Sequence, residues 1–139
     1  MKQDFSRKFA VIVNCDVEPW QAMNGLGHVA AYLGNKIGQP FDTNGDFVTR
    51  DRVGYPKNSQ YSLIVLRAHA GQMPNTMAKA RESGLLYHAF IEDMLENDDI
   101  EVQRQMDGRD DASTNYFAIG IFGPNEAVDA ITKKFQLWR

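Results

Sequence analysis

Residues 9–14 read FAVIVN, a short unbroken apolar run that is rich in β-branched side chains. Such a run is typical of a strand that is covered on both faces, near the centre of a sheet. Three other runs have the same character: SLIVLRA at 62–68, LYHAFI at 86–91 and NYFAIGIF at 115–122. Because Gly123 and Pro124 end the last run, the sequence predicts four separate core strands.

Helical patterns lie between these runs. The first has apolar residues at i, i+3, i+4 and i+7, namely Leu26, Val29, Ala30 and Leu33, with Gly34 where a C-terminal cap is expected. The second, NTMAKARES at 75–83, has Pro74 near its first turn and Gly84 just beyond its end. A third helix is predicted after Pro124.

Residues 38–60 and 95–114 interrupt this alternation and are predicted to be loop-rich insertions, the first with a strong turn signal, DTNGD, at 42–46. The chain has no internal repeat, low-complexity run or linker-like composition shift. Strands that alternate with helices favour a mostly parallel sheet covered on both faces. We therefore expect a single α/β domain over residues 1–139, with ligands at the carboxyl ends of its strands.

Composition excludes several classes of protein. The chain has 139 residues, of which 43% are hydrophobic and 24% charged, values that exclude a disordered or fibrous chain. No apolar run is long enough to cross a membrane, and residues 1–8 are too polar for a signal peptide. Cys15 is the only cysteine, so an internal disulfide or a multi-cysteine metal site cannot form. We expect a cytoplasmic protein with no membrane partner.

The charge of the chain is unevenly distributed. Residues 92–111 contain nine acidic residues against Arg104 and Arg109, a net charge of −7, whereas the whole chain carries −3. The rest of the chain is therefore mildly basic, at +4. The acidic segment has two interpretations, a solvated loop that favours solubility or a functional acidic patch.

Polar residues follow the predicted strands at their carboxyl ends. Asn14, Cys15 and Asp16 end the first strand, His69 follows the second, Glu92 and Asp93 follow the third, and His28 lies in the first turns of the predicted first helix. A histidine beside a carboxylate can act as a general acid or base near neutral pH. The alternative is that each histidine is an ordinary surface or packing residue.

Two further interpretations concern the same residues. Cys15 is either a thiol nucleophile or an inert, small apolar side chain. Asp16, His28, His69 and Asp93 have nitrogen and oxygen atoms that bind divalent metals, but no HxH or HExxH spacing accompanies them. The sequence therefore predicts neither a metal nor a cofactor.

The stretch NGLGH at 24–28 places Gly25 and Gly27 near the expected start of the first helix. Free backbone N–H groups at such a start can bind a phosphate or a carboxylate. The glycines equally permit a tight turn and close helix packing. Trp20, Met23 and Tyr32 either cover a groove or belong to the core.

Two longer stretches, NGLGHVAAYLG at 24–34 and NYFAIGIFGPNEAVDAITKKFQL at 115–137, resemble the paired signatures of the type II peptidyl-tRNA hydrolase superfamily, GKGKxAAQ and TxLAIGP. The closer resemblance is to an uncharacterised bacterial branch, domain of unknown function 2000, and it covers residues 9–139. The resemblance implies a three-layer α/β/α domain with a four-stranded mixed sheet. Its last strand would run antiparallel to the other three and would begin at the rim where they end.

The resemblance also implies roles for individual residues. Gly25 and Gly27 occupy the two glycine positions of the first signature, and Asp93 falls on the superfamily's active-site aspartate. The chain departs from the signatures at four positions: Leu26 and His28 replace lysines, Tyr32 replaces glutamine and Asn115 replaces threonine. The loss of both lysines removes charges that would hold a tRNA phosphate or polarise the scissile ester.

Our main hypothesis is a hydrolase of a small ester or amide, in which His28 activates water, Asp93 orients it and Asn115 stabilises the oxyanion. The ligand would contact five further residues: Asp16, Gly25, Gly27, Tyr32 and His69. The alternatives are a non-catalytic module that binds a small ligand or a protein, and a peptidyl-tRNA hydrolase that holds tRNA through basic residues. The C-terminal tail contains the apolar residues Phe135, Leu137 and Trp138, and it either docks on its own domain or pairs with a second copy. We expect the second outcome, a homodimer.

Overall fold

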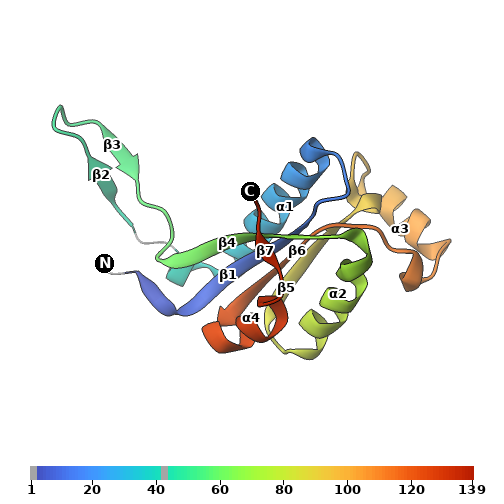
Figure 1. The fold of residues 1–139 in the computed structure, drawn as a ribbon. Helices are drawn as coiled ribbons and strands as arrows, with labels where there is room; N and C mark the ends of the chain where they lie inside the picture. The colour runs from blue at the N-terminus through green and yellow to red at the C-terminus, as the bar shows by residue number, and fades with distance from the viewer. Residues whose placement is uncertain (1–2, 42–43) are drawn as a thin grey trace.

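A computed structural model describes residues 3–41 and 44–139 and has a five-stranded mixed sheet at its centre (Figure 1). The strand order is β5-β6-β1-β4-β7. The bounds of these strands are β1 Asp4–Asn14, β4 Tyr61–Ala68, β5 Leu86–Ile91, β6 Tyr116–Pro124 and β7 Gln136–Leu137. The structure confirms the four predicted core strands, of which β1 begins five residues earlier than its apolar run.

The fifth strand corrects the expectation of a four-stranded sheet. β7 has only two residues, and both are exposed, so no apolar pattern marks it in the sequence. It pairs antiparallel with β4, with Leu137 opposite Leu66, and the N–H of Trp138 donates to the carbonyl of Val65 at 2.9 Å. The C-terminal tail therefore docks on its own domain.

The strand directions determine which residues meet at one edge of the sheet. β1 and β4 are parallel, whereas β6 is antiparallel to both β1 and β5, as expected. Asn14 lies opposite Ala68, and Ile91 lies opposite Tyr116. The ends of β1, β4 and β5 and the start of β6 therefore share one edge, which we call the rim.

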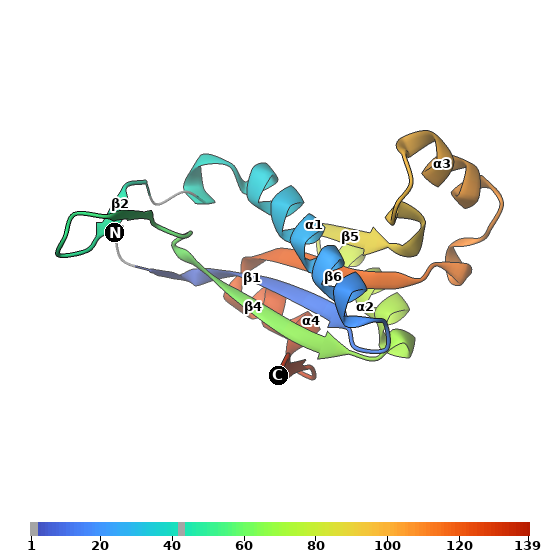
Figure 2. The same cartoon turned by 90° about the horizontal axis from the view of Figure 1, so that it is seen from above.

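Helices cover both faces of the sheet (Figure 2). α1 (Pro19–Ile37) packs on one face over Val11, Val13 and Phe117, while α2 (Met73–Glu82) and α4 (Asn125–Thr132) pack on the other over Ile12 and Ile119. Among the residues that the structure describes, four 3₁₀ turns connect elements: η1 (Gln39–Phe41), η2 (Ala70–Gln72), η3 (Glu92–Met94) and η4 (Asp111–Ser113). In the two described ranges, no helix is both long enough and apolar enough to cross a membrane.

The first helix is longer at both ends than its apolar period indicates. It begins at Pro19, after Glu18, whose N–H donates to the side chain of Gln21 at 3.1 Å. It continues through Gly34 and ends at Ile37, followed by the capping residue Gly38, which has a φ of +70°. The expectation that Gly25 lies at the helix start is therefore wrong, because α1 already includes the exposed Pro19 and Trp20 and the buried Ala22 before it reaches Gly25.

The two insertions contain more secondary structure than expected. Residues 95–114 contain α3 (Asp99–Asp107). The side chain of Asp98 caps its start by accepting a hydrogen bond from the N–H of Glu101 at 2.9 Å. No residue of α3 is buried, so the sequence shows no apolar period there. In the other insertion, β2 (Asp46–Val48) and β3 (Gly54–Pro56) form a hairpin that extends away from the sheet (Figures 1 and 2).

Part of the predicted turn at 42–46 lies outside the described residues, which exclude residues 42 and 43. Its described part supports the prediction. Asn44 and Gly45 both have positive φ values, of 55° and 81°, which are typical of tight turns.

Candidate functional site

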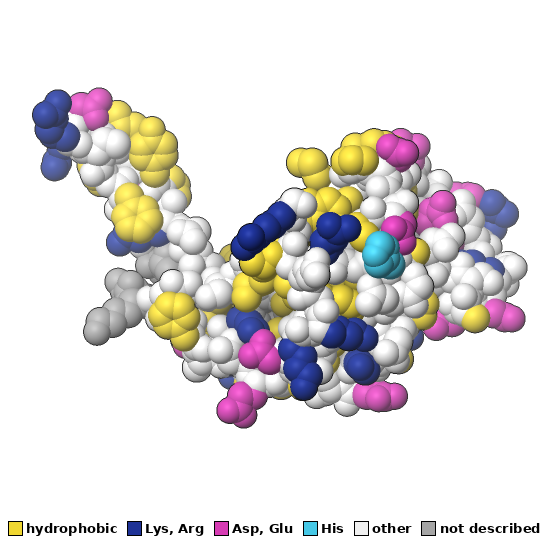
Figure 3. All heavy atoms as spheres, in the orientation of Figure 1, with side chains coloured by type: hydrophobic (Ala, Val, Ile, Leu, Met, Phe, Trp, Pro, Cys, Tyr) yellow, Lys and Arg dark blue, Asp and Glu magenta, His cyan; other side chains and the backbone are white. Residues whose placement is uncertain are grey.

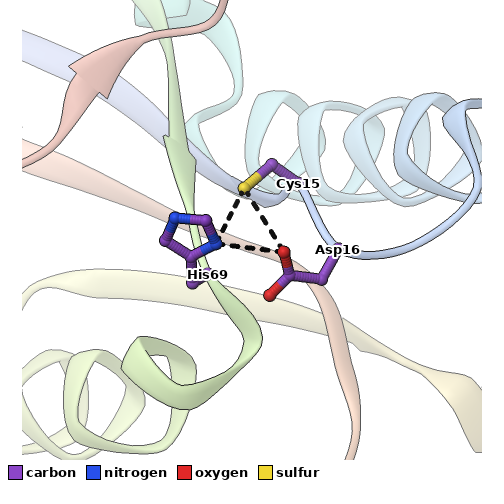
Figure 4. Close-up of side chains that lie close together, drawn as sticks. All are labelled: Cys15, Asp16 and His69. Carbon is purple, nitrogen blue, oxygen red and sulfur yellow. Dashed lines mark hydrogen bonds and ion pairs between the residues drawn. The ribbon is translucent and has the colours of Figure 1, made fainter.

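Three chemically distinct side chains meet at the rim: Cys15, Asp16 and His69 (Figure 4). We call this cluster the rim site. Cys15 and Asp16 follow β1, and His69 follows β4. Because β1 and β4 are parallel and Asn14 lies opposite Ala68, the residues that follow them emerge side by side.

The contacts within the rim site converge on one ring nitrogen. Nδ1 of His69 lies 3.0 Å from Oδ1 of Asp16 and 3.5 Å from Sγ of Cys15. Sγ of Cys15 lies 3.9 Å from the same Oδ1. Figure 4 shows the second ring nitrogen of His69 on the side away from Cys15 and Asp16.

Hydrogen bonds from the backbone fix the carboxylate of Asp16. Its Oδ2 accepts from the N–H of Ala70 at 2.8 Å. Its own N–H donates to Oδ1 of Asn14 at 2.8 Å, and the buried Asn14 side chain donates to the carbonyl of Tyr116 at 2.9 Å. The hydrogen bond from Ala70, followed by that from His69, lowers the pKa of Asp16 below its ordinary value, so this carboxylate is ionised at neutral pH.

A polar cavity of about 300 Å³ adjoins the rim site. Its lining includes Cys15 and His69 together with Arg67, Gln72, Lys134 and Gln136. Arg67 belongs to β4 and Gln136 to β7, so the docked tail forms one wall. Figure 3 shows basic side chains on this face around α4 and β7, whereas acidic side chains gather toward α3. The cavity therefore offers two cations and two amides to a small anionic molecule.

The other predicted site residues lie in different surroundings. His28 stacks on Phe90 with ring centroids 4.6 Å apart, and Tyr32 stacks on His88 at 3.9 Å. Burial, and secondarily the nearby His28, lowers the pKa of His88, which favours its neutral form. These rings pack α1 onto β5.

Asp93 is buried and forms an ion pair with Arg109. Nε and Nη2 of Arg109 donate to its two carboxylate oxygens at 3.0 and 2.7 Å, and Nη1 donates to Thr114 at 2.6 Å. The hydrogen bonds from Arg109 hold the pKa of Asp93 below its usual value. Within the described ranges, no hydrogen bond joins Asp93 to His28. The pair thus ties η3 to the segment that follows α3.

Asn115 and the two glycines also have structural contacts. The side chain of Asn115 donates to Glu92 at 2.7 Å. A Cβ at Gly25 would lie 3.0 Å from Cβ of Phe117, so this glycine permits close packing of α1 on β6. A Cβ at Gly27 would meet no atom within 4 Å. Both glycines lie inside α1, beyond the free N–H groups of its first turn.

Of the predicted site residues, the structure brings Asp16 and His69 into direct contact and adds Cys15 to them. Arg67 and Lys134 are among the basic residues that the tRNA hypothesis uses, but sequence reasoning did not place them beside His69. It also did not identify Arg109 as the partner of Asp93. Arg67 lies in β4, two residues before His69, and this spacing could have indicated that both side chains point to the same side of the strand. The roles of Lys134 and Arg109 depend on contacts that no local pattern reveals.

Comparison with known proteins establishes the family. The chain is similar to a solved structure of a protein of unknown function from Agrobacterium tumefaciens strain C58. The match covers 98% of this chain and 100% of that chain, with a TM-score of 0.83 and 18% sequence identity. At this identity the likeness shows a shared fold alone. No curated protein matches the chain. Residues 7–139 match the family described as protein of unknown function DUF2000, and the chain therefore belongs to the DUF2000 family.

Proposed function

We propose that this protein is a hydrolase of small anionic esters or amides and that the rim site is its active site. The observation that carries this proposal is the contact of His69 with Asp16 at the mouth of a cavity lined by Arg67 and Lys134. A carboxylate that holds one nitrogen of an imidazole directs the other nitrogen toward proton transfer.

The proposed chemistry uses the two ring nitrogens differently. The N–H at Nδ1 of His69 donates to Asp16, which leaves Nε2 to accept a proton from water. The oxygen of this water attacks the carbonyl carbon, and the bond from that carbon to the alcohol or amine breaks. The imidazolium then returns the proton to the leaving group, so that protons and electrons balance.

The cavity supports a small, negatively charged substrate. Its volume of about 300 Å³ suits a metabolite or a single acyl group. Arg67 and Lys134 would bind a carboxylate or phosphate on that molecule, and the amides of Gln72 and Gln136 would orient its polar groups.

The test is a panel of small chromogenic esters and amides, with and without a carboxylate or phosphate group. We expect hydrolysis by the wild type and a loss of about 100-fold or more in kcat/KM in His69→Ala. The activity of His28→Ala tests the sequence-based hypothesis, in which His28, Asp93 and Asn115 are catalytic. A loss in His28→Ala with full activity in His69→Ala would contradict the rim-site assignment.

The same assay separates the remaining alternatives. A non-catalytic binding module would show ligand-dependent thermal shifts without turnover. A peptidyl-tRNA hydrolase, which the superfamily resemblance implies, would cleave a peptidyl-tRNA analogue and lose affinity steeply with salt. The rim-site proposal is favoured because the cavity is small and contains two cations, whereas tRNA binding requires many phosphate contacts.

We also propose that two copies of this chain form a homodimer, and the expected cytoplasmic location stays a prediction from the sequence. The support is the β2–β3 hairpin, where Phe47 lies opposite Tyr55 and both are about 60% exposed (61% and 59%). Val48 and Val53 are exposed as well. A two-stranded hairpin alone is marginally stable, and exposed apolar clusters are typical of protein interfaces, so the proposed partner is a second copy.

A further inference from the structure

We propose that Cys15, Asp16 and His69 form a binding site for a divalent transition-metal ion of the zinc type. The geometry carries this inference, because one sulfur, one nitrogen and one oxygen atom face a common point. Their pairwise distances are 3.5 Å from sulfur to nitrogen, 3.0 Å from nitrogen to oxygen and 3.9 Å from sulfur to oxygen.

These distances resemble the edges of a tetrahedral zinc site. With Zn–S near 2.3 Å and Zn–N or Zn–O near 2.1 Å, tetrahedral angles place sulfur about 3.6 Å from nitrogen or oxygen. The same geometry places nitrogen about 3.4 Å from oxygen. Each observed distance differs from its expected value by about 0.4 Å or less, so small side-chain rotations complete the geometry.

Without an ion, the S–H of Cys15 donates to Oδ1 of Asp16 over 3.9 Å, a long hydrogen bond from a weak donor. A ring nitrogen carries at most one proton, yet Nδ1 of His69 faces both the sulfur of Cys15 and the carboxylate of Asp16. When protonated, it can donate well to only one of them. When unprotonated, its lone pair faces the negative carboxylate. A cation at the common point would accept a lone pair from all three atoms.

The donor set indicates which metals fit. Magnesium and calcium prefer oxygen ligands, so a set with a thiolate and an imidazole disfavours them. Zinc accepts sulfur, nitrogen and oxygen together, and its catalytic sites commonly use three protein ligands plus water. The deprotonated Cys15 and Asp16 would balance the charge of the ion.

The surroundings already hold the ligands in place, as outer contacts do in metalloproteins. The second oxygen of Asp16 is fixed by the N–H of Ala70, and the N–H of Cys15 donates to the carbonyl of Ala68 at 2.9 Å. The side chains of His69 and Asp16 are 69% and 46% exposed, so an ion and a fourth ligand can reach the site from solvent.

The inference goes beyond the proposed function, because Nδ1 of His69 would bind the ion instead of donating a hydrogen bond to Asp16. Zinc lowers the pKa of a bound water, so the ion would supply the nucleophile and His69 would hold the ion. Arg67 and Lys134 would then bind the anionic part of a substrate beside it. Metal binding and hydrolysis can therefore succeed or fail separately.

The test is a titration of tag-free, chelator-treated protein with Zn²⁺, followed by calorimetry, and with Co²⁺, followed by absorption. We expect one ion per chain, an intense tetrahedral Co²⁺ spectrum and a thiolate-to-cobalt charge-transfer band. His69→Ala and Cys15→Ser should each weaken Zn²⁺ binding by about tenfold or more. Cys15→Ser should also remove the charge-transfer band.

Asp110→Asn is the matched control, because it removes an exposed carboxylate from the acidic segment outside the site. It should bind Zn²⁺ as the wild type does. Absence of stoichiometric binding, or binding that survives His69→Ala and Cys15→Ser, would overturn the inference. Binding with no hydrolysis of any ester or amide would support the metal site and contradict the proposed function.

Discussion

Nδ1 of His69 lies 3.0 Å from Oδ1 of Asp16, although 53 positions separate the two residues in the chain. The contact follows from the parallel pairing of β1 with β4, which places the residues after Asn14 beside those after Ala68. It also brings the rim site next to Arg67 and Lys134.

Arg67→Gln should weaken the binding of anionic substrates at the cavity. Because the guanidinium can pair with a carboxylate or phosphate, we expect KM for such an ester to rise about tenfold, with a smaller change in kcat. A neutral ester of the same leaving group is the control and should be unaffected. An equal rise in KM for both esters would show that Arg67 does not bind the negative group of the substrate.

Asp93→Asn should destabilise the protein at neutral pH by about 1.5–3 kcal/mol, because it leaves Arg109 with a neutral partner in a largely buried position. The pKa of Asp93 is lowered on folding, so its contribution is full above its ordinary value of 3.8 and is lost as the pH falls toward the folded value. Urea unfolding at pH 7 and pH 3 measures the difference between wild type and variant. A difference that grows at pH 3 would contradict the ion-pair account.

Two glycines should respond to alanine in opposite directions. Gly27 lies inside α1 with open space around it, so Gly27→Ala should stabilise the protein by about 0.5–1 kcal/mol. A Cβ at Gly120 in β6 would overlap Cγ1 of Val29 and lie 2.7 Å from Cδ1 of Leu33. Gly120→Ala should therefore cost about 1–3 kcal/mol, measured by urea unfolding of both variants. Loss of stability in Gly27→Ala would mean that α1 is packed differently around this residue.

Truncation after Lys134 should destabilise the domain by about 3 kcal/mol or more, because it removes Phe135 from the core and β7 from the sheet edge. Thermal unfolding measures this effect. Truncation after Leu137 keeps Phe135 and should cost less. If both truncations left the melting temperature unchanged, the tail would not be docked on β4.

Phe47→Ser combined with Tyr55→Ser should dissociate the proposed homodimer, because these opposed rings form the largest apolar surface of the hairpin. Light scattering should give twice the single-chain mass of 15.7 kDa for the wild type and the single-chain mass for the variant. Ile100→Ser is the control, since it removes an apolar side chain that is 82% exposed on α3. A wild-type mass of one chain would exclude the dimer.

Much of the fold is predictable because its signals are local. The apolar run at 9–14 marks β1 as a central strand, and Pro74 and Gly84 bracket α2 as expected. Elements without a buried face gave no such signal. α3 has no buried residue, and β7 has two exposed ones, so each depends on a cap or on pairing with a distant strand.

Local sequence patterns are enough to identify an α/β protein whose strands are followed by polar groups, because apolar periodicity and strand ends depend on a few neighbouring residues. The contacts of His69 with Asp16 and Cys15, and of Asp93 with Arg109, appear in the folded domain and in no local pattern. Those partners depend on strand order, register and the path of the insertions. Strand order and register depend on packing between segments that are far apart in the chain, so a pattern within one segment does not predict them.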